Sequence, residues 1–453
     1  MPSRTLRSAL VCAVAALLLA PASAGARQSS DRAPRIVKQE EGEEHERNER
    51  WFYEQRAYPF GTIPPDARRR AWEHWKRIEP SLGAARRPPG APRATHRAAA
   101  GGTWRPIGPA PTSAAIGAIS PVSGRIRALA VSPADGRIVL VGAAVGGVWR
   151  SEDGGLTFAP TSDDHVDLAV GAIAFAPSAP ATVYAAMGQE YLGSGVLKST
   201  DEGRTWARVS GPSLPTPGLV EELVVDPSNP NRLYAAQYAG LADDGVLRGS
   251  GLQLSTDGGV SWSLTLSGLA RDAAVDPEDP RIVYATVDRI DDGSGRPPGV
   301  YRSSDSGRTW SLAWNSPFQH NLLSSYTVAV APGEPSRVVV HGYGAINSAY
   351  TTRVAVSNDR GQTWTVHGAS ELPRSRSSLL VISHADRDTV YVGFAGSDLY
   401  RSTDGGVSWQ CVTMGYCDGR FGSGDLTHVD QHCLAVAPDD ANRILLGNDG
   451  GLY

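Results

Sequence analysis

Two histidines and an aspartate near the C-terminus have the types and spacing of a binding site. They are His428, Asp430 and His432, which occupy alternate positions. Alternate residues of a β-strand share one face, and two imidazoles beside a carboxylate are able to hold a cation or a polar substrate. The same face continues into Leu434 and Val436, which equally fits a hydrogen-bonded cluster at the edge of a core. We expect binding residues here, and the sequence does not identify a metal.

Acid–base chemistry has three candidates, Asp430, Glu190 and Glu221. Glycoside hydrolysis needs two carboxyl groups about 5 to 10 Å apart across a cleft, and Asp430 with either glutamate is the pairing that the sequence offers. No spacing supports that pairing, and loop carboxylates are usually only solvated. The catalytic residues therefore stay unknown. No cofactor motif is present, so we expect no cofactor.

A repeated octapeptide organises most of the chain. Six copies of Ser-x-Asp-x-Gly-x-Thr/Ser-Trp, with small departures, start 45 to 56 residues apart. The aspartate caps a turn and the glycine two residues later accepts positive φ, so each copy predicts a hairpin corner. Six independent catalytic sites are implausible, and we assign a structural role to the six aspartates Asp153, Asp201, Asp257, Asp305, Asp359 and Asp404.

Short apolar runs precede each octapeptide. Leu129-Ala-Val-Ser-Pro133 and Leu434-Ala-Val-Ala-Pro438 are examples, and each is followed by a second run such as Arg137-Ile-Val-Leu-Val141. Near-continuous apolar runs of this length fit strands that are buried on both faces. Two strands before the octapeptide and two flanking it make four per repeat. The fold class is therefore all-β, a β-propeller of four-stranded blades, about seven of which are visible.

The octapeptides resemble the Asp-box, or BNR, repeats of sialidases, xyloglucanase-type glycoside hydrolases, sortilin-type receptor ectodomains and photosystem assembly factors. The resemblance covers residues 103–453. It implies that the boxes lie at the blade periphery, away from the central channel, so it carries no activity with it. It also implies that His428, Asp430 and His432 lie at the channel mouth, because they begin the innermost strand of blade seven.

The C-terminal residues raise the question of blade number. Ile444–Tyr453 aligns with Val139–Trp149 of blade one, which has a box after it. On that alignment the chain stops in mid-strand, and we expect a propeller that is incomplete at its C-terminus. Gly102-Thr-Trp-Arg-Pro106 resembles half a box, however, and offers the alternative of closing a seven-bladed ring.

The first hundred residues differ from the rest. Residues 1–26 have the charged start, apolar stretch and small-residue cleavage site of a signal peptide, which predicts a secreted or periplasmic protein. Residues 27–80 form a charged segment with a short helix behind Pro64, and residues 81–102 are a Pro/Ala/Arg-rich linker. No later stretch is long and apolar enough to span a membrane.

Charge argues against one class of partner. Residues 27–100 carry 16 Lys+Arg and 11 Asp+Glu, whereas residues 101–453 carry 25 and 36, which gives net charges of +5 and −11. An acidic propeller is a poor partner for nucleic acid, because phosphates require clustered basic side chains.

Three cysteines remain after the signal peptide, at Cys411, Cys417 and Cys433. Export permits disulfides, and an odd number leaves one thiol free or paired elsewhere. The clustering favours one local bridge without saying which. The spacing does not match a zinc site.

Two functions follow from these observations. The first is a sortilin-like binding module for a polypeptide or glycan at the channel mouth, which we favour because the motifs are structural. The alternative is a glycoside hydrolase of the xyloglucanase or sialidase type. The Arg-Ile-Pro motif of sialidases is absent before the first box, and xyloglucanases of this type place substrate between two tandem propellers.

Overall fold

The computed structural model describes a large part of the chain after residue 122. The described residues are 70, 73, 74, 77, 123–165, 167–189, 192–209, 219–238, 250–288, 297–318, 325–413, 428, 430–437 and 440–453. Arg70, Glu73, His74 and Arg77 are helical. The predicted signal peptide, the linker and Gly102–Pro106 lie outside the described residues, so the domain boundaries and the role of that half-box stay predictions.

In the described residues, 26 strands form seven antiparallel sheets, as the repeats predict. We number the sheets as blades in chain order. Blade 1 contains β1 (Ile126–Val131), β2 (Val139–Ala143), β3 (Gly147–Ser151) and β4 (Ala159–Pro160). Blade 2 contains β5 (Val170–Phe175), β6 (Val183–Gln189), β7 (Leu192–Ser199) and β8 (Ala207–Arg208). Blade 3 contains β9 (Leu219–Val225), β10 (Leu233–Tyr238), β11 (Gly251–Ser255) and β12 (Ser263–Ser267).

The remaining blades follow the same order. Blade 4 contains β13 (Ala270–Val275), β14 (Val283–Val287), β15 (Gly299–Ser303) and β16 (Ser311–Asn315). Blade 5 contains β17 (Ser325–Val330), β18 (Val338–Ile346), β19 (Ala349–Ser357) and β20 (Thr365–Gly368). Blade 6 contains β21 (Ser377–Ile382), β22 (Val390–Phe394), β23 (Leu399–Ser402) and β24 (Gln410–Cys411), and blade 7 contains β25 (Gln431–Ala437) and β26 (Asp440–Asn448).

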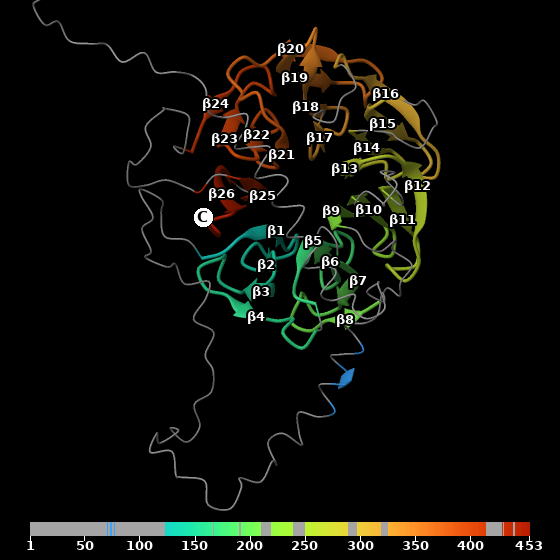
Figure 1. Ribbon diagram of the computed structural model, residues 1–453, viewed down its shortest axis with the longest axis vertical. Helices are drawn as coiled ribbons and strands as arrows, with labels where there is room; N and C mark the ends of the chain where they lie inside the picture. The colour runs from blue at the N-terminus through green and yellow to red at the C-terminus, as the bar shows by residue number, and fades with distance from the viewer. Residues whose placement is uncertain are drawn as a thin grey trace, which may run out of the picture. The chain divides into compact units, whose positions relative to one another are not determined.

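The blades form a ring around a common centre (Figure 1). The first strand of each blade is innermost, and β25 packs against β21 on one side and β1 on the other. Blade 7 thus stands between blade 6 and blade 1. Tyr453 exchanges two backbone hydrogen bonds with Leu446 of β26, so the last described residues occupy the third-strand position that the alignment with blade one predicts.

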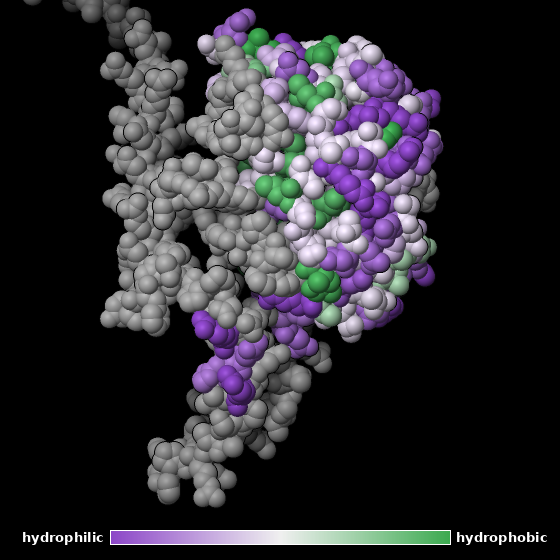
Figure 2. All heavy atoms as spheres, turned by 90° about the vertical axis from the view of Figure 1, so that its right-hand side faces the viewer, coloured by the Kyte–Doolittle hydropathy of each residue, from purple (hydrophilic) through white to green (hydrophobic). Residues whose placement is uncertain are grey.

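The cores lie between neighbouring blades, where apolar faces of two sheets meet. Every residue of β14 is buried, which agrees with its mainly apolar sequence. In one such core, Leu140 and Val148 of blade 1 pack with Val183 and Ala185 of blade 2. The outer strands face water instead, and Figure 2 shows a largely hydrophilic surface with separate hydrophobic patches on this side of the ring. Each blade therefore depends on its neighbours for burial.

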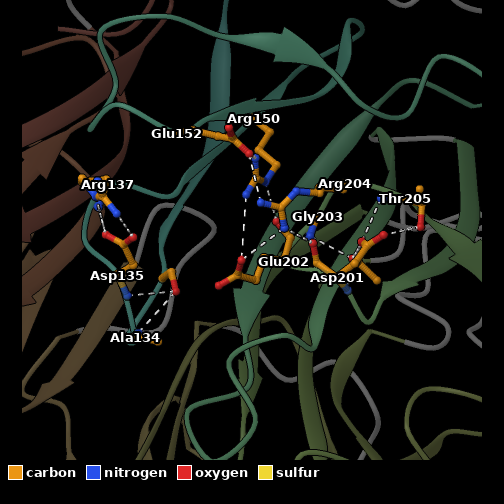
Figure 3. Close-up of polar contacts among 12 residues, drawn as sticks. Ala134, Asp135, Arg137, Arg150, Glu152, Asp201, Glu202, Gly203, Arg204 and Thr205 are labelled. Atoms are coloured by element: carbon orange, nitrogen blue, oxygen red, sulfur yellow. Dashed lines mark hydrogen bonds and ion pairs between the residues drawn. The ribbon is translucent and has the colours of Figure 1, made fainter.

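The box aspartates are saturated by hydrogen bonds inside their own turns. Asp201 accepts bonds from the Thr205 amide at 2.9 Å, the Thr205 hydroxyl at 2.6 Å and the Ser199 hydroxyl at 2.7 Å (Figure 3). The Ser199 hydroxyl in turn accepts a bond from the Gly203 amide. The other five boxes repeat this pattern, and the Thr309 hydroxyl and amide hold the pKa of Asp305 at about 2. Such bonding is what a turn-capping role requires.

Two consecutive residues of each box have positive φ. In the second box these are Glu202 at +59° and Gly203 at +80°. The sequence pattern predicted the glycine and missed the residue before it, which is not a glycine in three of the boxes. The turn tolerates this strain because the aspartate and serine bonds fix its backbone on both sides.

Each box also contacts the preceding blade. A methyl group at Gly203 would lie 2.7 Å from Leu140 of blade 1, and one at Gly155 would lie 3.4 Å from Leu445 of blade 7. Charged pairs follow the same junction, because Arg150 of blade 1 donates to the Glu202 carbonyl and Arg204 reaches Glu152 (Figure 3). The first box therefore extends the ring across the junction between blades 7 and 1.

We expect Asp257→Ala to destabilise the protein, because it removes the acceptor for the amides of Val260 and Ser261. The free energy of unfolding in urea should fall by about 1 kcal/mol or more, as when a cap is lost. Asp164→Ala, at an exposed aspartate outside the boxes, is the control and should be neutral. Equal stability of the two variants would contradict the capping role.

We expect Gly171→Ala to disturb the contact between blades 2 and 3. Its methyl group would lie 2.6 Å from the Val220 carbonyl oxygen, and overpacking against backbone costs about 1 to 3 kcal/mol. Gly136→Ala is the matched control, because a methyl group there meets nothing within 4 Å. The measurement is the melting temperature, and an unchanged value for Gly171→Ala would show that the inner strands are not closely packed.

Candidate functional site

The central channel contains a cavity of about 840 Å³. All seven innermost strands contribute to its wall. The charged residues that line it are Arg127, Glu221, Glu222, Arg271, Asp272, Arg376 and Asp430. A polar lining at the centre of an otherwise apolar set of inner strands makes this channel the candidate site.

A β-bulge places one polar residue of most inner strands in the channel. In β1, Ile126 pairs with Ala143 and Ala128 with Gly142, so Arg127 is an extra residue without a partner in β2. A bulge changes the direction of the side chain of its extra residue. This explains why a buried strand can contain a charged residue. The equivalent extra residues are Gly171 in β5, Glu221 in β9, Ser378 in β21 and His432 in β25, and β13 carries Arg271 and Asp272 at this point.

Glu221 is held by two arginines from other blades. Its carboxylate oxygens lie 3.5 Å from Arg127 of blade 1 and 3.5 Å from Arg271 of blade 4. Arg271 also donates to Asp288, which follows β14 and accepts a bond from the Tyr326 amide. Burial raises the pKa of Asp288 to about 6, although Arg271 opposes the shift. These ion pairs connect three blades across the channel wall.

Glu222 and Asp272 differ from Glu221 because no arginine among the described residues pairs with them. Asp272 accepts a bond from the Val328 amide at 2.9 Å. Burial raises the pKa of Asp272 to about 7. Burial, with the neighbouring charges of Asp272 and Glu221, raises the pKa of Glu222 well above its usual range. Both shifts favour the protonated carboxyl group over the carboxylate.

The predicted histidine–aspartate triplet does not lie on one strand face. Strand β25 begins only at Gln431, and Asp430 before it has a φ of +67°. Asp430 accepts a bond from the Gly396 amide, whereas the backbone carbonyl of His428 accepts bonds from Gln431 and Asn448. The shared-face argument is thus wrong, because the chain turns before the strand starts.

His432 nevertheless reaches the channel as the extra residue of its bulge. Its Nε2 lies 2.6 Å from Asp449, which also binds Arg125 at 2.6 Å. Burial lowers the pKa of His432, with the Asp449 hydrogen bond opposing that shift. The imidazole is therefore neutral near pH 7. Among the described residues no group of three His, Cys, Asp or Glu side chains has the arrangement of a metal site.

The structure gives a different result for each of the other residues that the sequence suggested. Glu221 and Asp430 line the same cavity, together with His432. Glu190 and Cys417 lie outside the described residues. Cys411 is disulfide-bonded and Cys433 is a free thiol in the channel wall, where burial raises its pKa to about 12. Cys433 is therefore a neutral thiol at physiological pH.

Sequence reasoning missed Arg127, Glu222, Arg271, Asp272 and Asp288. A signal existed for the first four, because each lies one or two positions before a repeated apolar run. Aligning the runs on their prolines puts Arg127, Glu221, Arg271 and His432 in one column. Polar residues at a fixed position before a buried strand indicate the wall of a shared cavity. Asp288 follows β14 and does not lie at a fixed position before a repeated apolar run.

Comparison with known proteins agrees with this architecture. The family described as "Sortilin, neurotensin receptor 3" matches residues 146–292. A probable oligoxyloglucan-reducing end-specific xyloglucanase of Neosartorya fischeri is 31% identical over 103 residues, which are 21% of this chain and 12% of that protein. The vacuolar protein sorting/targeting protein 10 of Colletotrichum graminicola is 33% identical over 72 residues, or 16% of this chain and 5% of that protein.

Solved structures show the same fold. The GH74 xyloglucanase of Xanthomonas campestris superposes with a TM-score of 0.55 at 18% identity, covering 73% of this chain and 51% of that one. The GH74 enzyme of Niastella koreensis has a TM-score of 0.53 at 19% identity, covering 74% and 52%. The chain thus spans about half the length of these enzymes and much less of the curated relatives. It is an Asp-box-like β-propeller, similar to those of sortilin and xyloglucanases.

The channel carboxyl groups predict how stability depends on pH. Because the pKa of Asp272 is raised from 3.8 to about 7, the folded state binds this proton more tightly than the unfolded chain does. The stabilisation that this proton gives the folded state is fully present below pH 4 and is lost as the pH rises through 7. We expect Asp272→Asn to melt at a higher temperature than the wild type at pH 8, and to show a smaller change in melting temperature between pH 5 and pH 8.

The pKa of Asp288 is raised to about 6 and that of Glu222 is raised as well, so the change should become smaller in the variant without vanishing. Asp164→Asn at the exposed surface is the control, and it should retain the wild-type pH profile. An Asp272→Asn profile that matches the wild type would mean that this carboxyl group titrates normally.

Proposed function

We propose that this protein is an exported binding module that holds a polypeptide segment in its central channel. One observation carries the proposal, namely that the bulges of separate inner strands direct charged and polar side chains into one cavity. A purely structural channel has no need of such side chains, because burying charge in an inner strand is costly. The arrangement instead offers a ligand several fixed polar contacts on a rigid scaffold.

The charges favour a polypeptide over a neutral glycan. The channel lining contains arginine and carboxylate side chains, and the residues that line it include no tryptophan, tyrosine or phenylalanine in the described part of the chain. A polypeptide has charged side chains and a backbone that donates and accepts hydrogen bonds, so it complements such a lining. A neutral glycan offers hydroxyl groups and ether oxygens but no charge.

Export is part of the proposal. The N-terminal sequence has the pattern of a signal peptide, and Cys411 is disulfide-bonded, which fits an oxidising compartment. Among the described residues no helix is long and apolar enough to cross a membrane. We infer a secreted or periplasmic location.

A glycoside hydrolase is the second candidate, and the buried carboxyl groups favour it. A hydrolase needs a protonated acid near neutral pH, and the raised pKa values of Glu222 and Asp272 supply one. The xyloglucanase relatives point to the same class of reaction. Glu222, Asp272 and Glu221 all lie within a channel, however, and a polymer substrate would have to thread it.

A binding screen with an activity assay separates the two candidates. The purified chain should enrich binders from a random peptide library, whereas incubation with xyloglucan oligosaccharides should give no new reducing ends. We expect Asp430→Ala to weaken binding of the enriched peptides by about 1 to 3 kcal/mol, because it removes a carboxylate from the channel wall.

Asp164→Ala is the control for this change, since its aspartate is exposed and does not line the channel. Melting curves of both variants separate lost contacts from lost fold, because Asp430 also accepts a bond from Gly396. Equal peptide binding by Asp430→Ala and the wild type would contradict the channel site. Turnover of xyloglucan that is lost in Glu222→Gln would establish the hydrolase instead.

A further inference from the structure

The carboxylates of the channel fall into two groups by their partners. Glu221 and Asp288 are paired with arginines, and Asp449 is paired with Arg125 and His432. Glu222 has no ion pair or hydrogen bond among the described residues, and Asp272 accepts backbone amide bonds alone. The channel therefore contains two adjacent carboxyl groups for which the described part of the chain supplies no cation.

These two carboxyl groups face the same space. Glu222 lies on β9 and Asp272 on β13, which are neighbouring innermost strands, and the charge of Asp272 raises the pKa of Glu222. The charge of Glu222 also acts on the Cys433 thiol, which belongs to blade 7 on the other side of the ring. Glu222 lines the channel cavity, as Asp272 does.

A second observation at the same cavity also points to a ligand. Ser325 at the start of β17 lines the channel and is 1% exposed. Its hydroxyl has no hydrogen-bond partner among the described residues. A buried hydroxyl without a partner costs stability, about 1 to 3 kcal/mol. This oxygen is closed to solvent, so a ligand donor in the channel would satisfy it once the Ser325 side chain rotates toward the cavity.

We propose that Glu222, Asp272 and Ser325 form a seat for one lysine or arginine side chain of the bound polypeptide. This inference rests on the proposed binding function and specifies the chemistry of the ligand. An ammonium or guanidinium group has only donors, three or five of them, and matches two carboxylates and a hydroxyl that all accept. Arg127 and Arg271 stand beside Glu221, so they repel a cation from that side and direct it to Glu222 and Asp272.

Other occupants fit these residues less well. An anion would meet two carboxyl groups without a cation between them. The described residues hold no three-ligand metal cluster. Water satisfies hydrogen bonds but does not offset the charge that forms when Glu222 and Asp272 lose their protons. A basic side chain meets both requirements and lowers the pKa of both groups on binding.

A selection experiment tests the seat. A random heptapeptide library is selected against the wild-type chain and against the double variant Glu222→Gln/Asp272→Asn. We expect lysine or arginine at one position of the wild-type binders, and loss of that preference with the double variant. Glu278→Gln is the matched control, because Glu278 lies in the turn after β13 and pairs with Arg360 outside the channel lining.

A mutant cycle then assigns the contact. Replacing the enriched lysine by norleucine should weaken binding to the wild type by 10-fold or more, and should have little effect on binding to the double variant. Melting curves establish that the variants are folded. Peptides that are enriched without a basic residue would overturn the seat and leave the binding function standing, whereas failure to enrich any peptide would count against both.

Discussion

The structure depends on the burial of apolar sheet faces between neighbouring blades. No blade has a core of its own, so Leu140 of blade 1 is buried by Val183 of blade 2, and the same dependence continues around the ring. The boxes strengthen each junction, since their glycines lie against the preceding blade. The carboxylates of the box aspartates accept hydrogen bonds within these turns. They are therefore not free to act as catalytic groups.

Because the blades must pack against each other, the centre of the ring is where residues can differ from one blade to the next. Inner strands pack closely at their apolar ends, and Gly171 shows how little room remains between β5 and β9. The bulges interrupt this packing at one level and let Arg127, Glu221, Arg271 and His432 enter the channel. A rigid scaffold with variable residues at one level is well suited to recognition, because each blade contributes a contact independently.

Relatives with different activities use this scaffold, which limits what similarity says about function. The matches include a family described as a receptor and proteins described as xyloglucanases. Sequence identity to the solved structures is below 20%, so they establish the fold. The partners of individual carboxylates are more informative, since Glu221 is neutralised within the protein whereas Glu222 and Asp272 are not.

The all-β class, the propeller and the position of the box turns could all be predicted from the sequence. This was possible because each repeat carries its own signals, an apolar run, an aspartate and a glycine, and these act over a few residues. The sequence also singled out Glu221, Asp430 and His432, which line the channel cavity, although the reason given for the last two was incorrect, since β25 starts after Asp430.

Which channel residues form ion pairs depends on the tertiary structure. Glu221 and Glu222 are adjacent in sequence and both line the channel cavity, yet one meets two arginines and the other meets none of the described arginines. Their partners lie on β1 and β13, far away in the chain, and are brought close only when the ring forms. The pKa of Asp272 likewise depends on burial by the assembled blades, which no local pattern encodes.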